Sequence, residues 1–175
     1  NVRQGVKWNN GDDFTADDVA NNIARWCDKG VEGNSMAARM GTLIDADTGQ
    51  AIAGAVAVVD AHTVQLTLPA PDITIIPGFA DYPAAIVHSS YDNGNPLDNP
   101  IGTGPYLPGT YEVGVKGILV KNADHTWWGE GAYLDSIEFI DYGTDPSAFV
   151  AAAESEEVDM FYETVTDFVG IMDSL

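Results

Sequence analysis

An amphipathic helix is predicted to begin just after Thr15. Val19, Ile23 and Trp26 follow at spacings of four and three, which places them on one face of a helix. Thr15 suits the N-cap position, and the aspartates at 17–18 fall in the first turn, where the helix dipole favours negative charge. We therefore expect a core-facing helix of about three turns, and we assign these aspartates to capping and not to metal binding or acid–base chemistry.

Runs rich in β-branched and aromatic residues predict strands in two regions. Residues 56–60 and 63–68 form two such runs about a tight turn, which is the pattern of a hairpin. Residues 106–113 and 117–121 predict a second antiparallel pair, and the alternation over 136–142 predicts a further strand. Most of the expected regular structure is therefore antiparallel.

Shorter elements are expected between these regions. Residues 2–8 suggest a short strand that ends in a cluster of turn formers, and the apolar residues at helical spacing over 36–43 suggest a short helix. The apolar run over 73–79 is expected to pack on the buried face of the first hairpin, before another short strand at 85–87.

The C-terminal region predicts an alternation of strand and helix. Asp145 can cap a helix, and Pro146 suits its first position. Residues 158–162 then predict a strand, and 165–175 a last helix. A strand, helix, strand order implies a right-handed crossover and a locally parallel sheet.

This expected crossover points to a ligand-facing position. Ligands of open α/β sheets bind beyond the carboxyl ends of the strands. The predicted strand over 158–162 ends at Tyr162, Glu163 and Thr164. We therefore expect these three residues to face a ligand.

Two prolines and two glycines punctuate residues 99–106, which have the sequence NPIGTGPY. Each proline fixes its own φ and biases the preceding residue toward an extended conformation, while glycine can enter regions closed to other residues. The alternatives are an ordinary loop and a structural hinge that holds two differently built parts at a fixed angle. The expected hinge residues are Gly102, Thr103, Gly104, Pro105 and Tyr106.

Charge excludes several classes of partner. The chain has seven basic and 27 acidic residues, a formal net charge of −20, which argues against binding nucleic acid or an anionic membrane surface. The acidic residues are spread along the chain, so they indicate a solvated surface suited to a salty setting, where screening weakens self-repulsion. At 175 residues, 45% of them hydrophobic, the chain can form one sizeable domain or two small ones.

Cysteine usage and hydropathy exclude further possibilities. Cys27 is the only cysteine, so the sequence has no internal disulfide, no CxxC redox pair and no cysteine-rich zinc site. No run approaches the roughly eighteen apolar residues of a membrane span, and we expect no direct membrane insertion. The chain starts at Asn1 within what we expect to be an element, so any export signal would have been removed or would lie outside this sequence.

The sequence contains no motif that requires an enzyme. There is no GxSxG elbow, no HExxH pair and no P-loop lysine, and His62, His88 and His125 are isolated from one another. Carboxylates are abundant, but acid–base catalysis needs a geometry that sequence alone does not show. A hydrolase that uses acidic residues therefore stays open as an alternative.

Two local patterns suggest binding. Residues 45–49, DADTG, resemble the opening of a calcium loop, but Val56 stands where an EF-hand needs a glutamate. A calcium-dependent extracellular module is therefore a second alternative. The pair Trp127 and Trp128 could stack on a sugar or base, although we favour a packing role for it.

Five pieces of the chain, in this order and spacing, resemble the extracytoplasmic solute-binding proteins of ABC importers, in the family that includes dipeptide-, oligopeptide- and nickel-binding proteins. The pieces are residues 5–8 (GVKW), Gly11 with 14–19 (FTADDV), 102–106 (GTGPY), 122–129 (NADHTWWG) and 158–160 (VDM). The resemblance runs through nearly the whole chain. Because members of that family are much longer, it also implies that this chain is an internal fragment.

The resemblance implies a mixed α/β (α+β) fold in two parts. Residues 1–98 would form part of the small extra α+β lobe of the peptide-binding family, and 99–175 would form part of the first ligand-binding lobe, of periplasmic-binding-protein type II. The second lobe would follow Leu175. The whole protein would then close two lobes around a solute, with peptide as the leading class, and present it to ABC permease subunits at the membrane from a periplasmic or extracytoplasmic location.

The resemblance also assigns site residues. It matches Tyr162, Glu163 and Thr164 to the strand end that faces the cleft, and it matches Asn34 and Met36 to a loop of the small lobe that can reach the far end of a long ligand. The charged group that holds a peptide amine would come from the second lobe. We expect no catalytic residue, no metal ligand and no cofactor in this chain.

Overall fold

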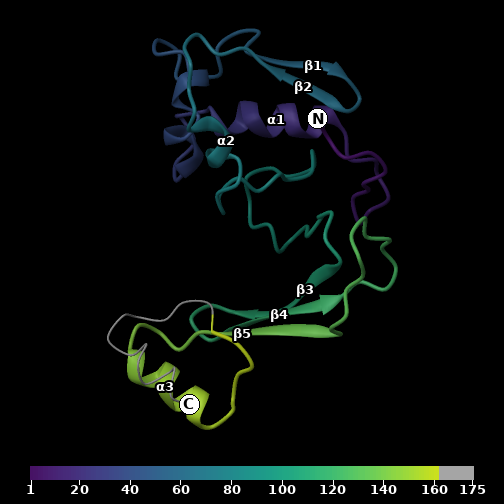
Figure 1. The fold of residues 1–175 in the computed structure, drawn as a ribbon, viewed down its shortest axis with the longest axis vertical. Coiled ribbons are helices and arrows are strands. Elements are labelled where there is room, and N and C mark those ends of the chain that lie inside the picture. The colour runs from purple at the N-terminus through teal and green to yellow at the C-terminus, as the bar shows by residue number, and fades with distance from the viewer. Residues whose placement is uncertain (162–175) are drawn as a thin grey trace. The chain divides into compact units, whose positions relative to one another are not determined.

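The computed structural model describes residues 1–161, which fall into two compact units (Figure 1). Unit 1 comprises Asn1–Pro105 and Asn122–Ala132, and unit 2 comprises Tyr106–Lys121 together with the described residues from Tyr133 onward. The chain therefore passes from unit 1 to unit 2 after Pro105, returns at Asn122 and leaves again at Tyr133. The division into lobes at residues 98 and 99 stays a prediction.

Unit 1 is built on helix α1, Ala16–Trp26. The helix begins after Thr15, as predicted, and the Thr15 N–H donates a hydrogen bond of 2.8 Å to the Asp18 carboxylate, one half of a capping box. Ile23 and Trp26 are buried, so the predicted apolar stripe faces the core. Local sequence and tertiary packing agree in this element.

The predicted first hairpin is present. Strands β1 (Val56–Asp60) and β2 (Thr63–Leu66) pair in antiparallel fashion, and the Asp60 carboxylate accepts the His62 N–H at 2.8 Å in the turn. Helix α1 contacts both strands and runs beside them in Figure 1. The hairpin therefore covers one side of the helix.

Short helical turns complete the core of unit 1. Two 3₁₀ helices, Ser35–Ala38 and Gly41–Leu43, replace the single helix predicted over 36–43, and α2 spans Ile75–Gly78. The spacing still has its predicted effect, because apolar side chains of these turns share one core cluster with those of α1. The largest of the fully buried side chains are Trp8, Met36, Met40, Leu43 and Cys27. Burial raises the pKa of the Cys27 thiol to about 11, so the thiol is protonated at neutral pH.

Three expectations for unit 1 need correction. Residues 2–8 form only an isolated bridge between Lys7 and Asp13, and residues 85–87 form no strand. In the run over 73–79, Ile75 is buried but Ile73 and Ile76 are exposed, so only part of it packs. Residues 2–8 and 85–87 lack a neighbouring strand among the described residues, and strand hydrogen bonds cannot form without one.

Unit 2 holds a three-stranded antiparallel sheet in the order β3-β4-β5, formed by Tyr106–Glu112, Lys116–Lys121 and Ser136–Ile140. The predicted pair over 106–121 is confirmed. Strand β5 ends two residues earlier than predicted, because Asp141 turns the chain by accepting the N–H of Gly143, whose φ is +69°.

Helix α3, Pro146–Glu154, follows the sheet and is capped as predicted. The Asp145 carboxylate accepts the Ser147 N–H at 3.0 Å. Residues 158–161 form no strand, which corrects the predicted parallel crossover over the described residues. The last helix predicted at 165–175 lies outside them.

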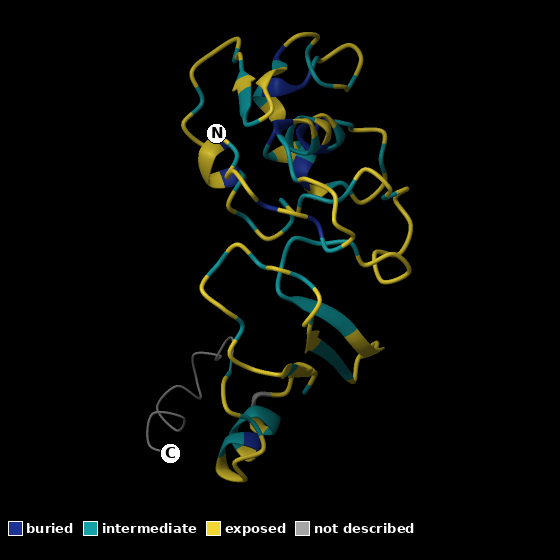
Figure 2. Ribbon diagram, turned by 90° about the vertical axis from the view of Figure 1, so that its right-hand side faces the viewer, coloured by how far each residue is buried: buried dark blue, intermediate teal, exposed yellow. Residues whose placement is uncertain are grey.

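Apolar side chains of unit 2 are mostly not enclosed by its described residues. Figure 2 shows the sheet as intermediate or exposed, and Ala152 is the single buried apolar residue of this unit within 133–161 and 106–121. The exposed apolar side chains include Tyr111, Val113, Val120, Phe139 and Met160. In the described part of the chain, no helix has the length and apolar character needed to cross a membrane.

Candidate functional site

The three residues expected to face a ligand, Tyr162, Glu163 and Thr164, lie outside the described residues. Their role stays a prediction. The segment that leads to them, 158–161, is described as irregular and not as a strand.

Asn34 and Met36 have structural contacts. The Asn34 amide nitrogen donates to the carbonyl oxygens of Asp28 at 2.8 Å and Trp26 at 3.1 Å, and its amide oxygen accepts the Met36 N–H at 3.2 Å. Asn34 thus caps the C-terminal end of α1 and the start of the next 3₁₀ helix at once. Met36 is only 2% exposed and belongs to the core cluster, so its side chain has almost no surface available to a ligand in this structure. Ligand contact by Asn34 and Met36 stays a prediction.

Replacing Asn34 by alanine is expected to lower the free energy of unfolding by about 1–2 kcal/mol, the usual cost of a lost cap. Chemical denaturation of the complete natural protein measures this. Asn21→Ala is the control and should cost little, because Asn21 is exposed and its side chain makes no hydrogen bond to the described residues. A change in solute affinity without any change in stability would contradict the capping role.

The segment expected to act as a hinge is tied to unit 1 by hydrogen bonds. The Asn9 N–H donates to the Gly102 carbonyl at 2.9 Å, and the Asn9 amide donates to the Pro100 carbonyl at 3.0 Å. The Asn122 N–H donates to the Pro105 carbonyl at 2.8 Å. These bonds hold the segment at the first passage between the units, while its action as a hinge stays a prediction.

The remaining residues of this segment show how it joins its neighbours. The Thr103 carbonyl lies 3.4 Å from Nε2 of His125. Tyr106 begins β3, and its hydroxyl donates to the Leu134 carbonyl at 3.0 Å. Neither Gly102 nor Gly104 has a positive φ, and a Cβ on either would meet no atom within 4 Å. Neither position therefore requires glycine in this conformation.

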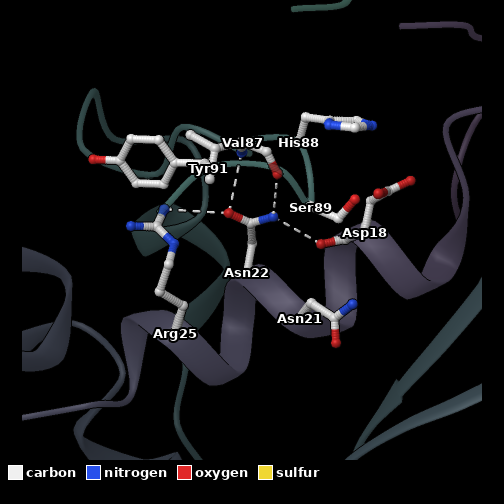
Figure 3. A pocket seen from close by; sticks show the side chains of 8 residues that line it. All are labelled: Asp18, Asn21, Asn22, Arg25, Val87, His88, Ser89 and Tyr91. Atoms are coloured by element: carbon white, nitrogen blue, oxygen red, sulfur yellow. Dashed lines mark hydrogen bonds between the residues drawn. The ribbon is translucent and has the colours of Figure 1, made fainter. Parts of the chain in front are cut away.

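A pocket of about 220 Å³ lies between α1 and the segment 87–91 (Figure 3). The helix and the segment supply four side chains each. They are Asp18, Asn21, Asn22 and Arg25 from α1, and Val87, His88, Ser89 and Tyr91 from the segment. The sequence predictions did not include this pocket.

Asn22 joins the two walls of the pocket. Its amide nitrogen donates to the carbonyls of Asp18 and Val87, both at 2.8 Å, and its amide oxygen accepts the Val87 N–H at 3.1 Å (Figure 3). With the bond from Arg25 at 3.2 Å, all four hydrogen-bonding positions of the amide are occupied. The side chain, 4% exposed, gives Val87 the partners that a neighbouring strand would otherwise provide.

The sequence contains a signal for this residue. Positions 19, 22, 23 and 26 share one helical face, so Asn22 is the polar residue within the apolar stripe. A buried polar side chain must find hydrogen-bond partners. The stripe alone thus indicates a buried amide contact, although it does not indicate which segment supplies the partners.

His88 is engaged on both ring nitrogens. Nε2 lies 3.1 Å from the Asp12 carboxylate and Nδ1 lies 2.9 Å from the Ser90 hydroxyl. The ring also makes an edge contact with Trp8, with centroids 5.2 Å apart. These contacts give His88 a structural role in joining the pocket to the N-terminal loop.

Arg25 forms the other end of the pocket. Its Nη2 donates to the Asn22 amide oxygen at 3.2 Å and lies 3.4 Å from the Ala85 carbonyl, and its Cζ lies 5.6 Å from the centre of the Tyr91 ring. Burial lowers the pKa of the Arg25 guanidinium from its ordinary value. Arginine remains protonated at physiological pH even so.

The two tryptophan rings contact each other and a neighbouring arginine. The rings of Trp127 and Trp128 are tilted, with centroids 5.3 Å apart, and the Arg3 guanidinium lies 4.7 Å from the centre of the Trp128 ring. Gly129 is required here, because a Cβ at this position would lie 2.5 Å from the Trp127 ring. This geometry supports the packing role expected for the pair.

The acidic loop at 45–49 closes on itself. The Asp45 carboxylate accepts the N–H groups of Asp47 at 3.0 Å and Thr48 at 2.9 Å, and these bonds lower its pKa. Within residues 1–161, no group of three or more His, Cys, Asp or Glu side chains is placed to hold a metal ion.

Comparison with known sequences supplies a family. The model described as "Bacterial extracellular solute-binding proteins, family 5 Middle" matches residues 1–173. No curated protein matches the chain at a significant level.

Comparison with solved structures supplies the fold. The chain is similar to MppA, the periplasmic murein tripeptide binding protein in its unliganded open form, with 21% identity and a TM-score of 0.77 over 98% of this chain and 35% of that one. It is similar to the oligopeptide-binding protein AppA from Bacillus subtilis in complex with a nonapeptide, with 20% identity and a TM-score of 0.72 over 98% and 33%. NikZ from Campylobacter jejuni in complex with Ni(L-His) gives 20% identity and a TM-score of 0.67 over 90% and 30%.

These likenesses show a periplasmic-binding-protein type II fold of mixed helices and strands, of which this chain corresponds to a part. The chain spans about a third of the length of the solved proteins it resembles.

Proposed function

The chain belongs to family 5 of the bacterial extracellular solute-binding proteins, and from this premise we propose that it is part of a longer protein that captures a solute outside the cytoplasmic membrane and delivers it to an ABC permease. The observation that carries the proposal is the family match, which extends over residues 1–173. Family and fold are those of transport binding proteins and not of enzymes.

A peptide is the proposed solute. Two of the solved proteins similar to this chain are a murein tripeptide binding protein and an oligopeptide-binding protein in complex with a nonapeptide, which supports this class. The similar protein NikZ is in complex with Ni(L-His) instead, so a metal chelate is the competing solute. The negative charge of the chain does not discriminate between them, because the acidic residues are dispersed and not gathered at one site.

The proposed mechanism is closure of two lobes without covalent change. A solute that contacts both lobes shifts the balance between open and closed forms by its difference in affinity for them. In this proposal Tyr162, Glu163 and Thr164 contribute the contacts of this chain, and the segment Gly102–Tyr106 contributes the fixed connection beside the cleft. The proposal assigns the group that receives the peptide amine to a second lobe.

Thermal unfolding of the complete natural protein tests the proposal, with the 175-residue chain measured beside it. Di- to pentapeptides, nickel with histidine, calcium and simple sugars are the ligands. At a hundredfold excess over the dissociation constant, a bound peptide should stabilise the complete protein by about 2.7 kcal/mol, several degrees for a domain of ordinary size.

The outcomes separate the candidates. We expect peptides to stabilise the complete protein and not the 175-residue chain, because the proposal assigns the other half of the cleft to a second lobe. Stabilisation by nickel with histidine alone would replace peptide by a metal chelate as the solute. Stabilisation of the 175-residue chain by calcium or by a sugar would contradict the proposal. It would indicate a calcium site at residues 45–49 or a sugar site at the tryptophan pair.

A further inference from the structure

We propose that the pocket between α1 and the segment 87–91 binds a small monocarboxylate, with the Arg25 guanidinium as the group that receives it. The proposal concerns unit 1 alone and does not depend on the identity of the transported solute. It rests on the ion pairs, the hydrogen bonds and the shape of this pocket.

Arg25 is the partly buried one of the basic residues without a carboxylate partner, since Arg3, Lys29 and Lys121 also form no ion pair among the described residues but are exposed. Lys7, Arg39 and Lys116 each pair with a carboxylate, on Asp13, Asp81 and Glu138 respectively. In the part of the chain that the structure describes, no carboxylate oxygen lies within 4.0 Å of the Arg25 guanidinium, although the chain carries 27 acidic residues. A partly buried cation without a carboxylate partner is costly, and an anion supplied from solution would offset that cost.

The guanidinium also has unused donors. Nη2 is the single nitrogen of this group with hydrogen bonds among residues 1–161, to Asn22 and to the Ala85 carbonyl. Nε is buried and makes none, and Nη1 makes none. Five N–H groups in a planar fork match the two oxygens of a carboxylate, and a buried donor without a partner commonly marks a missing water or ion.

The surroundings hold this guanidinium in place and leave other donors available. The Tyr91 ring lies over it at 5.6 Å, and Asn22 binds it from the side (Figure 3). Asn22 and His88 are saturated by protein partners. In contrast, the Ser89 hydroxyl and the Asn21 amide line the pocket without hydrogen bonds to described residues, so either can donate to a carboxylate oxygen.

Charge and volume limit the ligand to a small acid with one negative charge. Asp18 lines the opposite end of the pocket in Figure 3, seven residues or about 10 Å from Arg25 along the helix axis. Its carboxylate accepts the Thr15 N–H and lies 3.4 Å from the Trp8 indole nitrogen, and an acidic side chain at this end of the pocket disfavours a ligand with a second negative charge. A volume of about 220 Å³ corresponds to roughly seven water molecules.

Saturation-transfer NMR on the methyl protons of acetate tests the site in the complete natural protein. No transported solute is present, so the result is independent of the test of the proposed function. We expect saturable binding of acetate that persists in sodium chloride of equal ionic strength. Succinate and sulfate, with two charges, should compete more weakly than formate or propionate.

Two arginine variants supply the matched comparison. Arg25→Gln should weaken acetate binding at least about tenfold, the loss expected for a charge-assisted hydrogen bond. Arg3→Gln removes the same charge from another guanidinium that lies over an aromatic ring of unit 1, and it should bind acetate like the unaltered protein. Equal binding by both variants, or loss of the signal in sodium chloride alone, would overturn the proposal.

A third variant tests the proposal if Arg25→Gln does not fold. Arg25→Lys keeps the charge and the alkyl stem but lacks the planar fork, and circular dichroism checks that it remains folded. It should bind acetate more weakly than the unaltered protein and more tightly than Arg25→Gln. Binding by Arg25→Lys that equals that of the unaltered protein would rule out recognition by the fork.

Discussion

Replacing Trp8 by alanine lowers the free energy of unfolding of unit 1 by about 3–5 kcal/mol, the range measured for a large aromatic side chain in a core. Trp8 is 1% exposed. Its ring makes edge contacts with Phe14, at 5.4 Å between centroids, and with His88, at 5.2 Å. The substitution removes both contacts and leaves a cavity that the rigid neighbours fill only in part.

The effect of Trp8→Ala reaches beyond its own loop. Through Phe14 the side chain packs near the start of α1, and through His88 it contacts the wall of the pocket. Its indole nitrogen lies 3.4 Å from the carboxylate of Asp18, which also accepts the Thr15 N–H. We therefore expect the N-terminus of α1 and the segment 87–91 to lose protection from hydrogen exchange together.

Trp128→Ala is the matched control in the same unit. Trp128 is 43% exposed and contacts Trp127 and Arg3. Its removal should cost about 1 kcal/mol or less, since little buried area and one cation–π contact are lost. Urea denaturation followed by circular dichroism compares the two variants. Equal destabilisation by both would contradict the assignment of Trp8 to the core and of Trp128 to the surface.

Replacing Asn22 by alanine has the second large effect, a loss of about 2–4 kcal/mol in the free energy of unfolding. The half-buried Val87 loses the partners of its N–H and C=O together, and each polar group left unsatisfied away from water costs about 1–3 kcal/mol. Alanine is the better helix former, but that gain is smaller than the loss. The segment 87–91 should then separate from α1 and the pocket should open.

Asn21→Ala isolates the contribution of burial. Asn21 precedes Asn22 on the same helix but is exposed and makes no hydrogen bond to any residue of the described chain. Its replacement should change stability by no more than about 0.5 kcal/mol. Asn22→Asp is a further test, because the carboxylate keeps the shape but cannot donate to the Val87 carbonyl. If Asn22→Ala were as stable as Asn21→Ala, water would be replacing the amide, and the hydrogen bonds between Asn22 and Val87 would not contribute to stability.

Elements whose determinants lie within a few residues were predictable from the sequence. The caps at Thr15 and Asp145 and the spacing of Ile23 and Trp26 act within one or two helical turns, so α1 and α3 begin where the pattern indicates. The two hairpins over 56–66 and 106–121 likewise depend on short turns and local alternation. The family resemblance extends through the same local motifs and is confirmed by the family match.

Positions whose state depends on distant partners were not predictable in this way. Residues 85–87 have strand propensity but form no strand, and the Val87 N–H and C=O bond instead to Asn22, 65 positions away in the sequence. Packing places Asn34 at a helix cap and Met36 in the core, which the sequence did not indicate, while the ligand contact that the resemblance implies for them stays a prediction. The pocket itself arises only when α1 and the segment 87–91 are brought together.

The sequence by itself determined helices α1 and α3 with their caps, the two hairpins and the family, because periodicity and capping are interactions between near neighbours. Only the tertiary structure decided which polar side chain would bridge α1 to Val87 and which arginine would be enclosed without a carboxylate. Burial of apolar surface is non-directional; it drives the elements together without specifying which polar groups will meet. The hydrogen bonds of Asn22 and the lack of a carboxylate beside Arg25 result from that assembly, and no local sequence pattern predicts them.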